Sequence, residues 1–221
     1  MDIARRKLLA ALACAAALPL AARAQQREQM RRIGVLMNRA ADDPTGQARL
    51  KAFQQALQQL GWSDGRNVQI DVRWGENDAD RSRRYAQELV ALASDILLAS
   101  GTVSVTALQH VTRTLPIVFA VVSDPVGAGL VDTLARPGGN ATGFMNYEYD
   151  FSGKWLELLK QIAPRVTRAA VIRDAAIPAG IGQFSAIQAV ARSLRVEVNP
   201  ITISVRSGVS WRRSPARRMA A

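Results

Sequence analysis

An alternation of short apolar runs with amphipathic stretches between residues 31 and 122 constrains the fold more than any other feature of the chain. The apolar runs are continuous and rich in β-branched residues, which is typical of strands buried on both faces of a sheet. Strands are predicted at residues 31–38, 67–74, 95–99 and 116–122. Amphipathic stretches between them predict helices. This alternation predicts an α/β fold with helices on both faces of a parallel sheet.

Residues 116–143 are the most informative stretch. The run from Pro116 to Val122 predicts a buried strand, and the polar residues Ser123 and Asp124 follow it directly. Ligands of open α/β sheets bind at the carboxyl ends of the strands, so this loop is a candidate ligand contact. A short helix, a turn and a return strand are then predicted at residues 129–134, 136–140 and 142–146.

A second unit is predicted to begin at about Tyr147. It should contain a helix that ends before Pro164, and then a strand, a helix and a strand at residues 169–172, 183–194 and 196–203. One face of the first helix carries Trp155, Leu158, Leu159 and Ile162, and this spacing places Trp155 in a core. We therefore divide the chain into an N-terminal lobe at residues 25–143 and a partial C-terminal lobe at residues 144–204.

The formal net charge of +11 is concentrated at the two ends of the chain. Residues 1–24 carry four basic residues and one acidic residue, and residues 205–221 carry five arginines and no acid. The remainder is only weakly basic and has no basic patch with interleaved aromatic residues, so nucleic-acid binding is not expected.

Residues 1–24 have the pattern of an export signal peptide. Arg5-Arg6-Lys7 precedes an apolar stretch from Leu8 to Leu20, and Ala22-Arg23-Ala24 is a small-residue cleavage site. The paired arginines indicate a twin-arginine signal, with the general secretory route as the alternative. The apolar stretch is too short for a membrane anchor, and a lipoprotein at Cys14 is a further alternative. Cleavage after Ala24 would leave a periplasmic protein with no transmembrane span.

Residues 205–221 break with the rest of the chain, because they are rich in Arg, Ser and Ala and have no apolar period. They are either a flexible basic tail or the product of out-of-frame translation. The second interpretation predicts that the chain is truncated at its C-terminal side.

Two loops of the first lobe supply candidate ligand contacts. Ser100, Gly101 and Thr102 lie between a strand and a helix, where main-chain N–H groups and the helix dipole favour a carboxylate. The alternative is a plain helix cap by Ser100 or Thr102. In the next loop, Ser123 and Asp124 follow the fourth strand. Asp124 would either accept from a ligand's ammonium group or form a turn before Pro125.

Four weaker candidates complete the site hypothesis. Asn38 and Asp42 follow the first strand in the same way as the loops above. Asn140 and Thr142 precede the passage to the second unit and would face a cleft there, although turn residues need no function.

Several motifs resemble the substrate-binding component of ABC transporters, in the group related to tryptophan- and other amino-acid-binding proteins. The most specific are Asp124-Pro125-Val126, Gly129-Leu130-Val131, and Arg136-Pro137-Gly138-Gly139-Asn140 with Thr142-Gly143. The strand at residues 33–38, Ala99-Ser100-Gly101-Thr102, and residues 153–159 with 162–164 are also similar. The likeness runs from about Arg31 to Pro200, and we expect it to end after about Ser204.

This resemblance implies a periplasmic-binding type I fold of two doubly wound parallel-sheet lobes with strand order 2-1-3-4-5, the second lobe being incomplete. It implies a small ligand, with an amino acid as the family default, bound in a cleft between the lobes. Tyr147 and Trp155 would be aromatic walls of that cleft. The implied partners are the membrane permease and the ATPase of an ABC transporter.

Other functional classes are less well supported by the sequence. The chain lacks the G-x-S-x-G motif of a hydrolase and is not expected to be an enzyme. His110 is the only histidine and Cys14 the only cysteine, so neither a metal site built on them nor a cofactor is expected. The remaining alternatives are a periplasmic sensor module for a signalling partner and a truncated remnant that binds nothing.

Overall fold

The computed structural model describes residues 30–203, so the predicted signal peptide and the predicted basic tail lie outside the described residues. Its elements are β1 (Arg31–Met37), α2 (Pro44–Gln59), β2 (Val68–Trp74), α3 (Ala79–Ala91), β3 (Ile96–Ser100), α4 (Thr102–Val111), β4 (Ile117–Val122), β5 (Ala141–Met145), α5 (Phe151–Ile162), β6 (Arg168–Arg173), α6 (Pro178–Ala191) and β7 (Glu197–Thr202). Every helix between residues 30 and 203 is too short or too polar to span a bilayer.

Five parallel strands form the sheet of the first lobe, in the order β2-β1-β3-β4-β5. This is the predicted doubly wound order, and the predicted strands lie within a residue or two of the observed ones. The strand order reverses at β1, so the chain leaves neighbouring strands toward opposite faces of the sheet.

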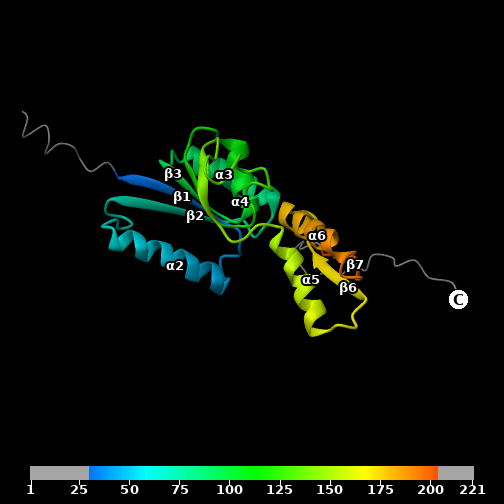
Figure 1. Cartoon of the computed structure of the whole chain (residues 1–221). Coiled ribbons are helices and arrows are strands. Elements are labelled where there is room, and N and C mark those ends of the chain that lie inside the picture. The colour runs from blue at the N-terminus through cyan, green and yellow to red at the C-terminus, as the bar shows by residue number, and fades with distance from the viewer. Residues whose placement is uncertain (1–29, 204–221) are drawn as a thin grey trace, which may run out of the picture.

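Helices cover the two faces of this sheet unequally. Figure 1 shows α3 and α4 on one face and α2 on the other. The main core lies under α3 and α4, and its fully buried side chains include Leu36, Leu89, Leu97, Val105, Leu108 and Ile117. On the other face, a groove of about 450 Å³ lies between α2 and the sheet. Its apolar lining includes Leu50, Phe53, Leu98, Val118 and Phe144.

The connection from β4 to β5 contains no helix, so the prediction of a helix at residues 129–134 is wrong. Pro125 and Gly129, which has a φ of +69°, favour turns over helix continuation. Leu130 and Val131 nevertheless reach the core, and the Gln109 side chain donates to the Leu130 carbonyl at 2.8 Å. The connection therefore covers the core that a crossover helix would otherwise cover.

The second lobe has the two predicted strands, β6 and β7, which form a parallel pair. The helix α6 packs on this pair and α5 packs on α6. A small core holds them together, with Leu156, Ile187, Ala191 and Val196 buried at its centre. The other face of the pair is bare within the described residues, and Ile172 is 59% exposed there.

The predicted inward face of α5 is wrong. Trp155, Leu158, Leu159 and Ile162 are 42%, 52%, 39% and 83% exposed. The helix turns its small residues toward α6 instead, because a Cβ on Gly153 would already lie 3.3 Å from the Val190 side chain. The close approach of α5 to α6 thus leaves the four large apolar side chains outside the contact between the two helices.

We expect hydrogen exchange to be slower in the first lobe than in the second. Residues 33–36 and 117–121 lie in strands with a neighbour on each side, whereas residues 169–172 lie in a two-stranded pair with one bare face. Opening of β6 should therefore be more frequent, and its amides should exchange about tenfold faster or more. Equal protection measured by mass spectrometry would show that the lobe boundary is misplaced.

Candidate binding site at the junction of the lobes

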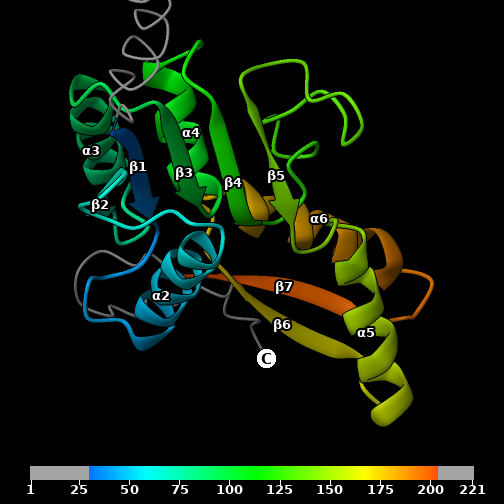
Figure 2. The same ribbon diagram turned by 90° about the vertical axis from the view of Figure 1, so that its left-hand side faces the viewer.

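The carboxyl ends of the first-lobe strands face the second lobe. Figure 2 shows the arrowheads of β1, β3 and β5 pointing toward β6, β7 and α6. A cavity of about 680 Å³ lies at this junction. Its lining comes mainly from the second lobe and includes Trp155, Arg173, Gln183 and Phe184. Tyr147 lines it from the connecting segment, and Ser123 is the single residue of the first lobe in the described lining. The volume is within the range of small-molecule sites, about 300–1,000 Å³.

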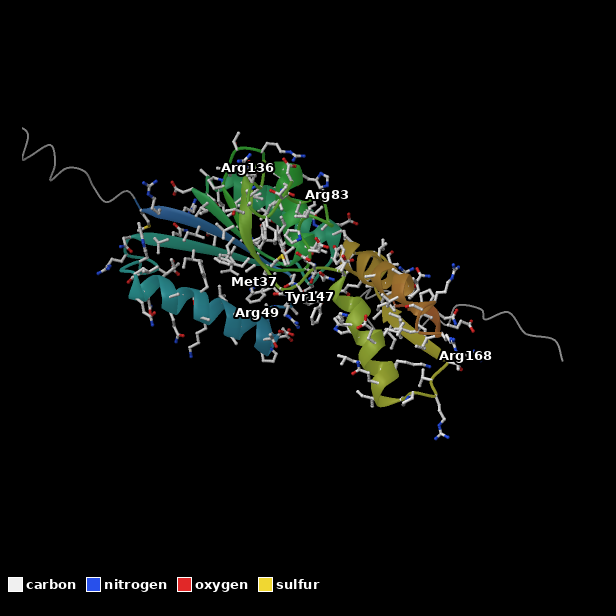
Figure 3. All side chains as sticks on the ribbon, in the orientation of Figure 1. Met37, Arg49, Arg83, Arg136, Tyr147 and Arg168 are labelled. Atoms are coloured by element: carbon white, nitrogen blue, oxygen red, sulfur yellow. The ribbon has the colours of Figure 1, made fainter. Side chains whose placement is uncertain are left out.

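Tyr147 lies at the junction of the two lobes, as Figure 3 shows, and it lines the cavity. Its hydroxyl accepts a hydrogen bond of 2.8 Å from the Gln183 side chain on α6. Its ring meets Trp155 edge-on, with centroids 6.0 Å apart and an interplanar angle of 73°. Trp155 is therefore part of an aromatic wall and does not lie in a core, which was the expectation from its helical spacing.

Asp124 is held by the main chain on both of its carboxylate oxygens. Oδ1 accepts from the Gly127 N–H at 2.7 Å, and Oδ2 accepts from the Tyr149 N–H at 3.1 Å. Its φ of 43° is in the left-handed region, which aspartate tolerates better than most residues. The turn alternative for Asp124 is the one that the geometry supports, and its carboxylate ties the β4 loop to the segment that enters the second lobe.

Tyr149 anchors that segment to α6. Its ring occupies the space left by the missing side chain of Gly182, where any Cβ would collide with it. The side chain is 8% exposed, and its hydroxyl has no hydrogen-bond partner among the described residues. Burial and, second, the negative charge of Asp124 raise the pKa of Tyr149 above its ordinary value. The phenol therefore stays neutral and packs as an apolar side chain against α6.

Asn38, Ser100 and Gly101 come together at neighbouring strand ends. The Ser100 hydroxyl donates to Asn38 Oδ1 at 3.2 Å. Gly101 has a φ of 82°, and a Cβ there would lie 2.6 Å from Asn38 Nδ2, so only glycine fits. Gly101 is itself the N-cap of α4 and Thr102 is the first helical residue, so neither Ser100 nor Thr102 caps the helix. The first turn of α4 is left without a side-chain cap.

Three predicted site residues lie elsewhere. Asn140 precedes β5 at the opposite edge of the sheet, where its amide donates to the carbonyls of Thr112 at 3.3 Å and Leu115 at 2.7 Å. Thr142 is near the same amino end of β5. Asp42 is exposed in the loop before α2 and does not line the cavity. The structure thus brings Ser123 and Tyr147 into the cavity lining and leaves the other eight predicted residues out of it: these three, and Asn38, Ser100, Gly101, Thr102 and Asp124.

Sequence reasoning missed the contribution of the second lobe to the cavity. Arg173 ends β6 and Asp174 follows it, and both line the cavity together with Gln183 and Phe184 from α6. The same signal that indicated Ser123, polar residues directly after an apolar strand, is present at Arg173-Asp174. This signal supplied the predicted site residues of the first lobe only.

We expect Asp124→Ala to cost about 1–3 kcal/mol of unfolding free energy, because it removes two main-chain hydrogen bonds to a carboxylate and places alanine at a positive φ. Asp124→Asn should cost about half as much, since its amide oxygen still accepts from Gly127. The exposed Asp132 in the same connection is the matched control. Urea unfolding that shows equal effects for Asp124→Ala and Asp132→Ala would contradict this role.

The structure has two α/β lobes joined by one connecting segment, with a cavity near their junction. The family model described as ABC transporter substrate binding protein matches residues 35–213. The chain belongs to this family. The match passes Ser204, so the likeness extends further along the chain than we expected.

Similar proteins agree with this assignment. The chain is 33% identical over 145 residues to a tyrosine-binding protein of Clostridioides difficile, covering 66% of this chain and 41% of that protein. It superposes with a TM-score of 0.69 and 27% identity on an ABC domain in complex with L-Trp from Streptococcus pneumonia, covering 78% and 57% of the two chains. It superposes with a TM-score of 0.57 and 31% sequence identity on a ligand-free, open substrate binding protein from Clostridium difficile, covering 78% of this chain and 58% of that chain. The fold is the periplasmic-binding type I fold, and the chain spans little more than half of these structures.

Proposed function

We propose that this chain is the substrate-binding component of an ABC transporter and that it captures an amino acid in the cavity between its lobes. The observation that carries the proposal is the cavity of about 680 Å³, whose described lining comes mainly from the second lobe and includes Ser123, which follows β4 at the carboxyl edge of the first sheet. Similar proteins that bind tyrosine and tryptophan support an amino acid as the ligand. Binding and release, without chemical conversion, are the activity we propose.

Within the cavity, Tyr147 and Trp155 are the proposed aromatic wall, and Ser123 offers a hydroxyl from the β4 end. Asn38, Ser100, Gly101 and Thr102 lie at neighbouring strand ends of the first lobe and are outside the described cavity lining. The amino end of α4 there has main-chain N–H groups without a side-chain cap. Closure would bring the second lobe against these strand ends by rotation about the connecting segment.

Trp155 and Trp62 provide a matched pair for testing the cavity. They are 42% and 39% exposed, but Trp62 lies in the connection from α2 to β2, away from the cavity. Calorimetry with L-tyrosine and L-tryptophan should detect binding to the full chain. Trp155→Ala should weaken it about tenfold or more through the loss of an aromatic contact, and Trp62→Ala should not. The absence of binding to the unaltered chain, or equal effects of both substitutions, would contradict the proposed site.

Export is the second part of the proposal. Residues 1–24 are proposed to be a cleaved twin-arginine signal that delivers the protein to the periplasm, where it would meet a permease and its ATPase. Replacing Arg5 and Arg6 with lysines should block export of a folded reporter fused to this segment. Arg23→Lys, next to the proposed cleavage site, is the charge-matched control. Export that continues unchanged with the double replacement would contradict the twin-arginine assignment.

A further inference from the structure

Arg173 is an unusual residue in the second lobe, because its half-buried guanidinium lies over an aromatic ring and forms no ion pair within the described residues. It ends β6, and its guanidinium carbon lies 4.5 Å from the centroid of the Phe184 ring. Its Nε is buried and has no hydrogen-bond partner among the described residues. The ion pairs between residues 30 and 203 do not include it.

The cavity explains where a partner for Arg173 would come from. Arg173 is the single basic residue in the described lining, and most of that lining is apolar or aromatic. A buried donor without an acceptor is destabilising, so a ligand that supplies the acceptor relieves this cost. A single guanidinium matches the charge of a monoanion, and its fork of N–H groups matches the two oxygens of a carboxylate.

The ring of Phe184 holds the guanidinium in place before a ligand arrives. Phe184 is 5% exposed, so its ring is fixed by the packing of α6 on the second lobe. A cation that is already oriented loses less conformational entropy on binding, which favours affinity. Asp174 is the single acidic residue of the described lining, and its Oδ1 accepts from the Ala176 N–H at 2.9 Å, so it is turned to its own loop.

We propose that Arg173 is the carboxylate receptor of the cavity, and that the site recognises aromatic carboxylates by this charge together with the wall of Tyr147 and Trp155. This inference rests on the proposed function and places the anionic end of the ligand on the second lobe. The ammonium group of an amino acid is a secondary feature, because both oxygens of Asp124, the residue expected to bind it, are engaged by main-chain N–H groups. Aromatic acids without an amino group are therefore ligands of the same site.

Three probes that share a phenol separate these contributions: L-tyrosine, 3-(4-hydroxyphenyl)propanoate, which lacks the ammonium group, and tyramine, which lacks the carboxylate. Calorimetry on the full chain should show comparable affinities for the first two and at least about tenfold weaker binding of tyramine. The proposal would be overturned if tyramine bound as tightly as L-tyrosine. It would also be overturned if 3-(4-hydroxyphenyl)propanoate bound about tenfold more weakly than L-tyrosine.

Substitutions of Arg173 provide a second measurement. Arg173→Gln should weaken both carboxylates about tenfold or more and leave tyramine unchanged, and Arg173→Lys should be intermediate because an ammonium group cannot bind both oxygens in a fork. Arg168→Gln is the matched control, since Arg168 begins the same strand and Figure 3 shows it away from Tyr147 and the junction. If circular dichroism shows that the Arg173→Gln variant does not fold, the role of Arg173 is tested by the Arg173→Lys variant and by the three probes on the unaltered chain.

The two proposals fail in different ways. If the unaltered chain binds none of the probes, the proposed function fails, and this inference fails with it. If the chain binds L-tyrosine and Arg173→Gln binds it equally well, the proposed function stands and the carboxylate receptor is elsewhere. A loss of L-tyrosine binding on Ser100→Ala, with Arg173→Gln unchanged, would place the carboxylate at the amino end of α4.

Discussion

Leu97→Ala is expected to lower the unfolding free energy of the first lobe by about 2–5 kcal/mol. Leu97 is fully buried in β3, between β1 and β4 and under α3 and α4. Truncation to alanine removes buried methyl groups and leaves a cavity that packed strands cannot close. Urea unfolding followed by circular dichroism measures this loss.

Leu134→Ala is the control for this substitution, because Leu134 is 54% exposed in the connection from β4 to β5. The same chemical change at an exposed site should cost about 0.5 kcal/mol or less. A loss at Leu97 no larger than the loss at Leu134 would contradict the position of the core beneath α3 and α4.

Gly143→Ala is expected to disrupt the pairing of β4 with β5, at a cost of about 3 kcal/mol or more. A Cβ at residue 143 would lie 2.7 Å from the Phe119 nitrogen and closer still to the Phe119 carbonyl oxygen. These are main-chain atoms in the neighbouring strand, so they cannot move aside as a flexible side chain would. The strand β4 is irregular between Phe119 and Val122, and this irregularity brings its main chain against Gly143.

Gly139→Ala is the matched control, because a Cβ there meets no atom within 4 Å and the main chain is not left-handed. It should be neutral or slightly stabilising, since alanine restricts the unfolded chain. Thermal unfolding of the two variants should therefore differ clearly. Similar midpoints would show that β5 does not pair with β4 in the register described.

Much of the first lobe could be predicted from the sequence, because its signals are local. Continuous β-branched runs identified the strands, and the order 2-1-3-4-5 followed from the resemblance. The helix predicted at residues 129–134 failed because Pro125 and Gly129 favour turns, and packing of Leu130 on the core needs no helix. The prediction of the buried face of α5 was wrong because an apolar stripe in the sequence does not identify the element that packs against the helix. Close packing of Gly153 on α6 decided the orientation instead.

A polar residue that follows a strand was a better guide to the cavity than one that precedes a strand, although Asn38, Ser100 and Asp124 also lie at strand ends and are outside the lining. Ser123 follows β4 and lies at the cavity, whereas Asn140 and Thr142 belong to the start of β5 and so lie at the opposite edge. Their closeness in sequence to the passage between lobes was misleading. Arg173 satisfies the successful rule, but its partner Phe184 is eleven residues further along the chain. Only the folded α6 brings the two together.

Within residues 30–203, the chain passes between the lobes once, through the segment between β5 and α5. The affinity for a ligand therefore depends on the fraction of molecules whose lobes are oriented for binding. One connection permits twisting as well as opening, so we expect the lobes to sample several mutual orientations, of which some align the residues that would contact a ligand. The apparent dissociation constant equals the intrinsic one divided by the fraction of molecules in an aligned orientation. Contacts that restrict this sampling, such as the hydrogen bond from the Tyr149 N–H to Asp124 Oδ2, should therefore change affinity without touching the ligand.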